Sequence, residues 1–305
     1  MEVKLKAYLA LAFICIVWGT TYLAVRVGVQ NFPPFLFMGL RQTLAGFLLM
    51  AFVVLSGKRQ QLRWCVFRQQ LIPGICMITF GNGVIAWAVQ YIPSGIAALI
   101  CSMIPLYVIL INLLIDRKER LNWQIILGTA MGLAGIILIF KDHLAELHNR
   151  EYLAGIVITI AACISWAAGT IYAKKNKSAS DPILDASIQL FIGGAGLLIM
   201  SSLLEQRTSI PVLTGQALFA WIYLVVFGSV AAFAAYLYAL SKLPVALVTV
   251  YAYINPVVAV ALGFFLLNEQ INTYTALAAL IILAGVYLVN AGYSLQHAMS
   301  KHTVR

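Results

Sequence analysis

Charged residues are scarce in this sequence. Asp, Glu, Lys and Arg together make up 10% of the 305 residues, whereas 62% of the residues are hydrophobic. A soluble domain typically carries about a quarter charged residues, because water must solvate its surface. The shortage of charge excludes an ordinary soluble domain and indicates that lipid covers most of the surface.

Acidic side chains are especially few, and none stands in the middle of an apolar segment. Those near apolar segments lie at segment ends or in connections: Asp116, Glu119, Asp181, Asp185, Glu205 and Glu269. An intramembrane enzyme would need a nucleophile with a base, or a carboxylate pair, at depth, and a proton relay would need a buried carboxylate. We therefore predict no catalytic residues, no enzymatic activity and no cofactor.

Cysteine and histidine are also sparse. The five cysteines form no CxxC pair, and an odd number cannot all pair within one chain. The four histidines lie in loops or the tail, and the segment from His143 to His148 matches no zinc signature. We predict neither a disulfide framework nor a metal site.

Basic residues are in excess, with a formal net charge of +10. They occur in short clusters between apolar runs and form no basic face, which argues against nucleic-acid binding. The same pattern is what orients a protein in a membrane.

The apolar runs predict ten membrane-spanning helices. Three runs each fit one crossing of about 20 residues: Leu121–Phe140, Tyr152–Ala173 and Ala186–Leu204. The Asn31-Phe-Pro-Pro34 turn separates two helices near Ala7–Val29 and Pro33–Ser56, and the first of these is too long for the apolar core of a signal peptide. The last helix covers about Asn272–Tyr293.

The remaining two runs are each long enough for two crossings. Gln69–Ile115 carries no charge over 47 residues, which is about 70 Å of helix. A proline disfavours helix at the residue before it, so this run divides at Gln90-Tyr-Ile-Pro-Ser-Gly95. Thr208–Leu267 divides at Ser241-Lys-Leu-Pro244 for the same reason.

The distribution of Lys and Arg predicts the orientation. If the N-terminus is cytoplasmic, the cytoplasmic segments hold 15 basic residues and the opposite side holds 3, while Arg26 and Arg41 lie within helices. Such a bias over short loops places both termini in the cytoplasm.

The two halves resemble each other and predict a duplication. Cys15-Ile-Val-Trp18 returns as Cys163-Ile-Ser-Trp166. Pro93 and Pro105 return as Pro244 and Pro256 with the same spacing, and Glu119 with Gly135 returns as Glu269 with Gly285. Five helices per half is an odd number, so the second copy must be inverted in the membrane, as in transporters that alternate access around a central site.

We predict an all-α membrane protein of two inverted five-helix repeats. The expected organisation is a first repeat at 1–141, a periplasmic connection at 142–151, a second repeat at 152–293 and a cytoplasmic tail at 294–305.

Several motifs resemble the EamA-type drug/metabolite transporters over essentially the whole chain. The motifs that carry the resemblance are Trp18-Gly-Thr-Thr-Tyr22, Arg41, Pro93-Ser-Gly-Ile-Ala-Ala98, Tyr251-Ala-Tyr-Ile-Asn-Pro256 and Glu269. With Gly81-Asn-Gly83, the sequence is most similar to the YedA-like branch of inner-membrane exporters. The resemblance implies export of amino acids, other metabolites or toxic organic compounds across the bacterial cytoplasmic membrane.

Two tryptophans lie near the middle of their helices, away from the interfaces where tryptophan usually concentrates. Trp18 and Trp166 are repeat equivalents, and we expect them on opposite walls of a central cavity, although packing is the alternative role. Other polar side chains at comparable depth are candidates for binding substrate or for packing between helices: Thr20, Thr21, Tyr22, Asn82, Ser102, Tyr236, Tyr251, Tyr253 and Asn255.

Pro105 and Pro256 should kink their helices and free the carbonyls of Cys101 and Ala252.

The two intramembrane arginines differ in depth. Arg26 lies near a helix end, where its side chain can snorkel to the surface. Arg41 lies about 12 Å below the outer surface. Its charge must meet water or an acceptor, and the sequence allows either a helix end or carbonyl in the other repeat, or a substrate carboxylate.

These residues predict a secondary transporter of small amphipathic organic solutes, acting as an exporter by alternating access, with the lipid bilayer and a small-molecule substrate as its partners. The alternative is a nucleotide-sugar or other metabolite carrier or importer of the same superfamily, whose substrate would call for several deep cations. The residues indicate no particular oligomeric state.

The inverted topology is testable by labelling. In a cysteine-free background, single cysteines placed near Glu119 and near Glu269 should react with a membrane-impermeant maleimide from opposite sides of the membrane. The inverted-repeat prediction is wrong if the reagent applied outside reaches both positions equally.

Overall fold

The computed structural model describes residues 2–30, 32–56, 64–115, 122–142, 149–176, 180–205, 215–243, 248, 251–267 and 273–303. Every regular element in these residues is helical. The elements are α1 (Glu2–Val29), α2 (Pro34–Leu55), α3 (Trp64–Pro73), η1 (Gly74–Gly83), α4 (Val84–Ala88), α5 (Ser94–Cys101), α6 (Ile104–Ile115), α7 (Trp123–Asp142), α8 (Arg150–Lys175), α9 (Pro182–Leu204), α10 (Gly215–Tyr223), η3 (Leu224–Ala231), α11 (Ala232–Lys242), α13 (Tyr251–Leu267) and α14 (Thr273–Thr303).

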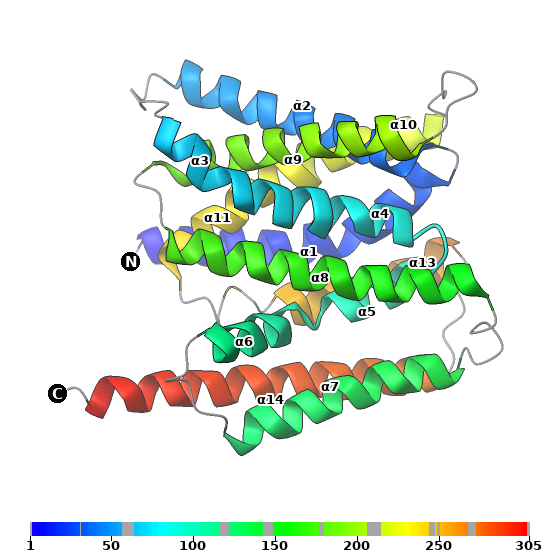
Figure 1. The fold of residues 1–305 in the computed structure, drawn as a ribbon, viewed down its shortest axis with the longest axis vertical. Helices are drawn as coiled ribbons and strands as arrows, with labels where there is room; N and C mark the ends of the chain where they lie inside the picture. Colours follow the sequence, from blue (N-terminus) through cyan, green and yellow to red (C-terminus); the bar gives the residue numbers. More distant parts are fainter. Residues whose placement is uncertain are drawn as a thin grey trace.

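Six helical segments of the described chain are long and apolar enough to cross a membrane, judged by length and composition: Leu5–Val29, Pro34–Leu55, Trp64–Ala88, Arg150–Lys175, Pro182–Leu204 and Gly215–Lys242. Four shorter apolar stretches accompany them: Ser94–Val108, Trp123–Gly135, Ile254–Leu266 and Ala276–Val289. The helices lie side by side in one bundle (Figure 1). The predicted all-α membrane architecture is confirmed at this level.

The segments Trp64–Ala88 and Gly215–Lys242 each contain a π-helix, which sequence analysis did not predict. η1 and η3 begin 150 residues apart, the same separation that relates Glu119 to Glu269. Each packs on the first two helices of the other half, η1 on α8 and α9 and η3 on α1 and α2. Pro73 directly precedes η1, but η3 has no proline, so proline is not the common cause.

The helix expected to kink at Pro105 is instead interrupted before it. α5 ends at Cys101 and α6 begins at Ile104. In the turn between them, the N–H of Ser102 bonds the carbonyls of Ala98 and Leu99, and the N–H of Met103 bonds that of Ile100 at 3.1 Å. Pro256, by contrast, lies inside the continuous helix α13. The first N–H groups of a helix have no acceptor within that helix, so a proline placed there loses no hydrogen bond. This preference explains why the helix breaks ahead of Pro105 and a new one begins at Ile104.

The helix contacts repeat between the halves. α2 packs on α9 and α7 packs on α14, which are equivalent helices of the two halves. α1 packs on α13 and α11, and its equivalent α8 packs on α6 and η1. The equivalent helices run in opposite directions, as α1 with α8, α2 with α9 and α7 with α14 show, and the start of α1 and the end of α14 lie at the same end of the bundle (Figure 1).

Some residues on which the orientation and repeat predictions depend lie outside the described residues. These are Lys58, Arg59, Arg63, Arg117, Lys118, Glu119, Arg120, Lys177, Arg207, Pro244, Glu269 and Arg305. His143, Glu146 and His148 also lie outside them, within the predicted connection at 142–151. The orientation and the repeat boundaries therefore stay predictions.

Glycines bring α7 and α14 into close contact. A Cβ added at Gly285 would lie 2.6 Å from the carbonyl oxygen of Gly128 and 3.0 Å from the amide of Gly132. Both contacts involve backbone atoms, which cannot move aside as a side chain can. In lipid, where apolar burial drives little association between helices, such close backbone approach is a main source of packing energy.

Substituting Gly285→Leu should therefore destabilise the protein, because the added side chain meets the α7 backbone. Overpacking typically costs about 1–3 kcal/mol, which should lower both the folded yield and the thermal unfolding temperature in detergent. Gly215→Leu is the matched control, since nothing lies within 4 Å of a Cβ built at Gly215. Equal stability of the two variants would contradict the tight α7–α14 contact.

Candidate functional site

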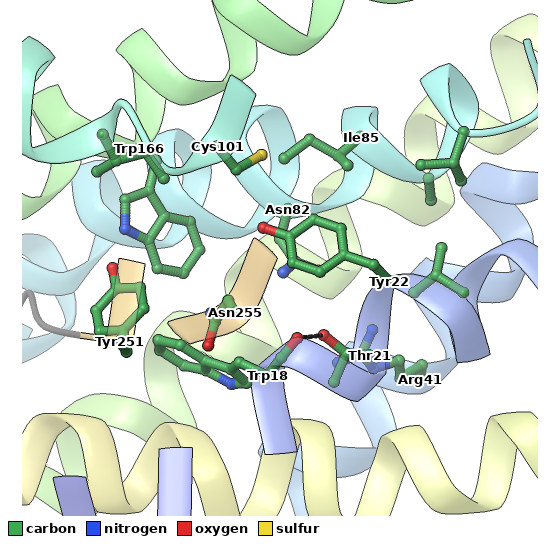
Figure 2. Close-up of a pocket in the computed structure, with 14 residues that line it drawn as sticks. Trp18, Thr21, Tyr22, Arg41, Asn82, Ile85, Cys101, Trp166, Tyr251 and Asn255 are labelled. Carbon is green, nitrogen blue, oxygen red and sulfur yellow. Dashed lines mark hydrogen bonds between the residues drawn. The ribbon is translucent and has the colours of Figure 1, made fainter. Parts of the chain in front are cut away.

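A small cavity lies at the centre of the bundle. Side chains from α1, α2, η1, α4, α5, α6, α8 and α13 line it, so both halves contribute (Figure 2). Its volume is about 80 Å³, well below the roughly 300–1,000 Å³ of ligand pockets. An amino-acid-sized solute does not fit in this volume, so its binding requires the walls of the cavity to separate.

Three aromatic rings, those of Trp18, Trp166 and Tyr251, form one wall, and Tyr236 packs behind them. The ring of Trp18 contacts that of Trp166 edge-on, with centroids 6.2 Å apart. It also contacts Tyr236 at 5.1 Å and Tyr251 at 5.0 Å. Sequence analysis expected the two tryptophans on opposite walls of the cavity. In the structure they touch each other. Tilted and edge-on aromatic contacts are favourable arrangements, so the wall is a packed unit.

The two indole N–H groups differ in their hydrogen bonding. Trp18 Nε1 donates to the carbonyl of Gly228 at 3.3 Å. Trp166 Nε1 is buried and has no hydrogen-bond partner among the described residues, although the Tyr251 side chain lies close to it. A buried donor without an acceptor costs about 1–3 kcal/mol. Because Trp166 lines the cavity, a bound solute can supply that acceptor.

Arg41 is buried at the opposite end of the aromatic wall from Tyr251, with 2% of its surface exposed (Figure 2). Its Nε donates to Ser229 Oγ at 2.9 Å and its Nη1 to Met38 Sδ at 3.4 Å. Within the described residues it has no carboxylate partner, and it caps no backbone carbonyl. The sequence left two roles open for Arg41, namely capping a helix end or carbonyl in the other repeat and binding a substrate carboxylate. The described part of the chain shows no bond to a carbonyl, and the second role stays a prediction.

A hydrogen-bond chain connects Arg41 to the cavity wall across both halves. Ser229 Oγ, which accepts from Arg41, donates to Gln42 Oε1 at 2.8 Å. Gln42 Nε2 then donates to Asn82 Oδ1 at 3.1 Å. Asn82 lines the cavity, and its amide nitrogen has no acceptor in the part of the chain that the structure describes. The chain therefore ends on a second free donor.

The cavity is rich in donors and lacks acidic groups. Arg41 Nη2 and the Asn82 amide nitrogen have no acceptor among the described residues, and Trp166 Nε1 makes no well-formed hydrogen bond there, although the Tyr251 side chain is close. None of the lining residues is Asp or Glu. Such a site favours a solute that brings acceptor oxygens, and above all a carboxylate, which arginine can bind through two parallel hydrogen bonds.

Eight of the twelve candidate residues named from the sequence line this cavity: Trp18, Thr21, Tyr22, Arg41, Asn82, Trp166, Tyr251 and Asn255. The side chain of a ninth, Tyr253, is outside the described part. With its amide nitrogen as donor, Asn255 bonds the carbonyls of Cys15 and Tyr251. The contact of each residue with substrate remains a prediction.

Three predicted residues do not line the cavity. Thr20 bonds the carbonyl of Val17 and the hydroxyl of Tyr223. Ser102 is buried and donates to the carbonyl of Leu99 at 2.6 Å. Tyr236 stands behind the cavity wall, where its ring packs on Trp18. These side chains support local helix structure and packing.

Sequence analysis did not identify the apolar part of the lining or the inner links of the hydrogen-bond chain. The apolar lining comprises Val25, Ile85, Ala86, Val89 and Ile104, with Cys101, which had been considered only for its carbonyl. Gln42 and Ser229 were missed although both are polar residues inside apolar helices. Their position was a usable signal, because such residues need partners in the membrane.

Two charged side chains cap helix ends away from the cavity. Arg26 Nη1 donates to the carbonyl of Ile92 at 2.6 Å, so it bonds the turn after α4 instead of only snorkelling. Glu205 accepts from the N–H groups of Phe35 and Leu36 at 2.6 and 3.1 Å. These N–H groups begin α2, where a carboxylate is favoured.

A bundle of membrane-length apolar helices, formed by two similar halves around a polar central cavity, is the architecture of a membrane transport protein. The chain belongs to the EamA-like transporter family, whose model matches residues 5–141 and 153–291, once in each half. This match confirms the sequence-based resemblance and assigns the chain to a family of transporters, not of enzymes. Within the described residues, no group of three or more His, Cys, Asp or Glu side chains could hold a metal ion.

Similar proteins agree with this assignment. The chain is 36% identical over 286 residues to the uncharacterized inner membrane transporter YedA of Escherichia coli K12, covering 93% of this chain and 90% of the relative. It is 25% identical to a "probable amino-acid metabolite efflux pump" of the same organism, covering 90% of this chain and 91% of the relative. A solved crystal structure with 22% identity matches with a TM-score of 0.66 over 94% of this chain and 96% of that chain, which supports the fold.

Proposed function

We propose that this protein is a secondary transporter of the bacterial inner membrane that exports small amphipathic organic solutes by alternating access. In this proposal it has ten transmembrane helices in two inverted repeats, with both termini in the cytoplasm. The relatives named as an inner membrane transporter and as an amino-acid metabolite efflux pump support the membrane and the direction. The excess of basic residues in the predicted cytoplasmic segments supports the orientation.

The acid-free, donor-rich cavity carries the proposal for the solute. Arg41 and the free donors of Asn82 and Trp166 suit a carboxylate and other acceptor oxygens. The aromatic wall suits an apolar side chain. A solute that is neutral or zwitterionic overall, with an apolar part, fits both features, and amino acids and aromatic metabolites belong to this class.

The small volume of the cavity supports alternating access, because a solute can bind only when the walls separate. Its lining comes from both halves, so any movement that widens it on one side changes how the halves meet. The interrupted segment at Ser102 and Met103 and the π-helices η1 and η3 are irregular backbone beside this cavity. Irregular backbone within a membrane is tolerated only where it is buried in protein or lines a cavity, and we assign these elements to the moving walls.

A nucleotide-sugar carrier fits the site less well. Its substrate carries a diphosphate, which would call for several cations, and Arg41 is the one cation among the residues that line the described cavity. An import direction is the other alternative, and it is distinguished by the sidedness of transport.

Transport by proteoliposomes tests the solute class. Arg41→Lys keeps the positive charge but loses the planar fork that binds a carboxylate through two hydrogen bonds. Hydrogen bonds to charged groups contribute about 1.5–3 kcal/mol, so transport of L-phenylalanine should fall about tenfold or more. Transport of N-acetyl-phenylalanine amide, which has no carboxylate, should fall much less.

Arg68→Lys is the matched control, because Arg68 is exposed on α3. It should transport both solutes at the original rate. Equal losses for both solutes in Arg41→Lys would make Arg41 a structural residue. Transport of a permanently cationic dye that survives Trp18→Ala and Trp166→Ala would argue against this cavity as the site.

A further inference from the structure

Two cysteines from different halves lie side by side at the cavity wall. The sulfur of Cys101, the last residue of α5, is 3.5 Å from that of Cys163 in α8. Cys163 also points its thiol toward the carbonyl of Ile100 at 3.9 Å. Both residues are buried, with 4% and 0% of their surfaces exposed. The two thiols are therefore neighbours held in place by the packing of α5 on α8.

This pair is reachable from the cavity. Cys101 lines the cavity and is labelled beside Trp166 and Ile85 in Figure 2. A small neutral reagent that enters the cavity thus meets a thiol with a second thiol directly behind it. Among the described residues, Cys101 and Cys163 are the one pair of cysteines whose sulfurs are in contact, and Cys65 is exposed.

The pair occurs in one half of the pseudo-symmetric structure only. Cys15 is the repeat equivalent of Cys163, but the residue equivalent to Cys101, four positions before the proline of its helix, is Ala252. The duplication therefore does not require a thiol at this position. The pair also lies at the contact between the halves next to the Ser102–Met103 interruption, which separates α5 from α6.

We propose that Cys101 and Cys163 form an oxidation site that locks the transporter. A two-electron oxidant of the peroxide or azo class converts the two thiols to one disulfide. With hydrogen peroxide, the two S–H bonds and the O–O bond break, the S–S bond forms, and two water molecules are released. The sulfurs must approach from 3.5 Å to about 2.05 Å, which side-chain rotation and small helix shifts supply.

The disulfide would couple α5 of the first half to α8 of the second. Alternating access requires these halves to move against each other, so a covalent bond between them at the cavity wall should stop the cycle. This consequence rests on the proposed transport function, whereas formation of the disulfide does not.

The experiment uses the purified full chain in proteoliposomes, treated with diamide. Free thiols are then counted by maleimide alkylation after denaturation, and disulfide-linked peptides are identified by mass spectrometry. We expect two of the five thiols to be lost, in a linkage between Cys101 and Cys163. L-phenylalanine transport should fall at least tenfold and recover with dithiothreitol.

Variants separate this site from other effects of the oxidant, each compared with its own untreated sample. Cys163→Ser cannot form the disulfide and should keep its transport rate after diamide. Cys76→Ser retains the pair and should be inhibited like the original protein. Full alkylation of Cys101 and Cys163 after diamide, or a disulfide between other cysteines, would overturn the site.

A disulfide that leaves transport unchanged would overturn the lock. Hydrogen–deuterium exchange gives a readout that does not need a transported solute, since the disulfide should slow exchange in α5 and α8. If the untreated protein transports none of the solutes tested, the proposed function fails. Slower exchange in α5 and α8 after oxidation still supports a disulfide that restrains the two halves. Unchanged exchange refutes that restraint.

Discussion

A guanidinium surrounded by apolar helices needs acceptors, and the described neighbours of Arg41 are neutral. A charge near the middle of a membrane costs at least about 2.5–3.5 kcal/mol. Ser229 and Met38 lower that cost by accepting hydrogen bonds from Arg41, and Gln42 in turn accepts from Ser229, but part of the guanidinium has no partner among the described residues. The position of Arg41, the donors around it and the absence of a lining carboxylate together support the proposal that the cavity binds an acceptor-bearing solute.

The packing of the two halves makes this arrangement possible. Arg41 comes from α2, while its acceptor Ser229 comes from η3 of the other half. The equivalent π-helix η1 supplies Asn82, which ends the same hydrogen-bond chain. The π-helices that the duplication places in equivalent positions thus each contribute one residue to the hydrogen-bond chain of Arg41. The glycine contact between α7 and α14 lies outside this region and stabilises the bundle without shaping the site.

Much of the fold was predictable because hydrocarbon imposes a simple constraint. Every crossing needs about 20 apolar residues, so charges and prolines delimited α1, α2, α8 and α9 to within a few residues. The position of Trp18, Trp166 and Arg41 along these helices also pointed to the interior of the bundle, where all three line the cavity. No local pattern in the sequence predicted the π-helices, which pack on helices of the other half. Pro105 indicated a distortion of its helix, but not that the helix would break ahead of it.

The same reason explains what was missed at the site. Which face of a helix points to the cavity depends on neighbours far away in the sequence, so the sequence could not separate Thr21, which lines the cavity, from its neighbour Thr20, which does not. Ser229 became significant only when its contact with Arg41, 188 residues away, was visible. Apolar lining residues such as Ile85 carry no local signal, because lipid, packed core and cavity wall all accept the same side chains.

The most direct test measures the culture medium of three kinds of cells, which produce the original protein, the Arg41→Gln variant or neither. The two proteins must be present at equal folded amounts. An untargeted measurement of extracellular metabolites should show carboxylate-bearing solutes with an apolar part accumulating with the original protein. Arg41→Gln should lose most of that accumulation. Equal accumulation with both proteins, or accumulation confined to solutes without a carboxylate, would contradict the role assigned to Arg41 and its cavity.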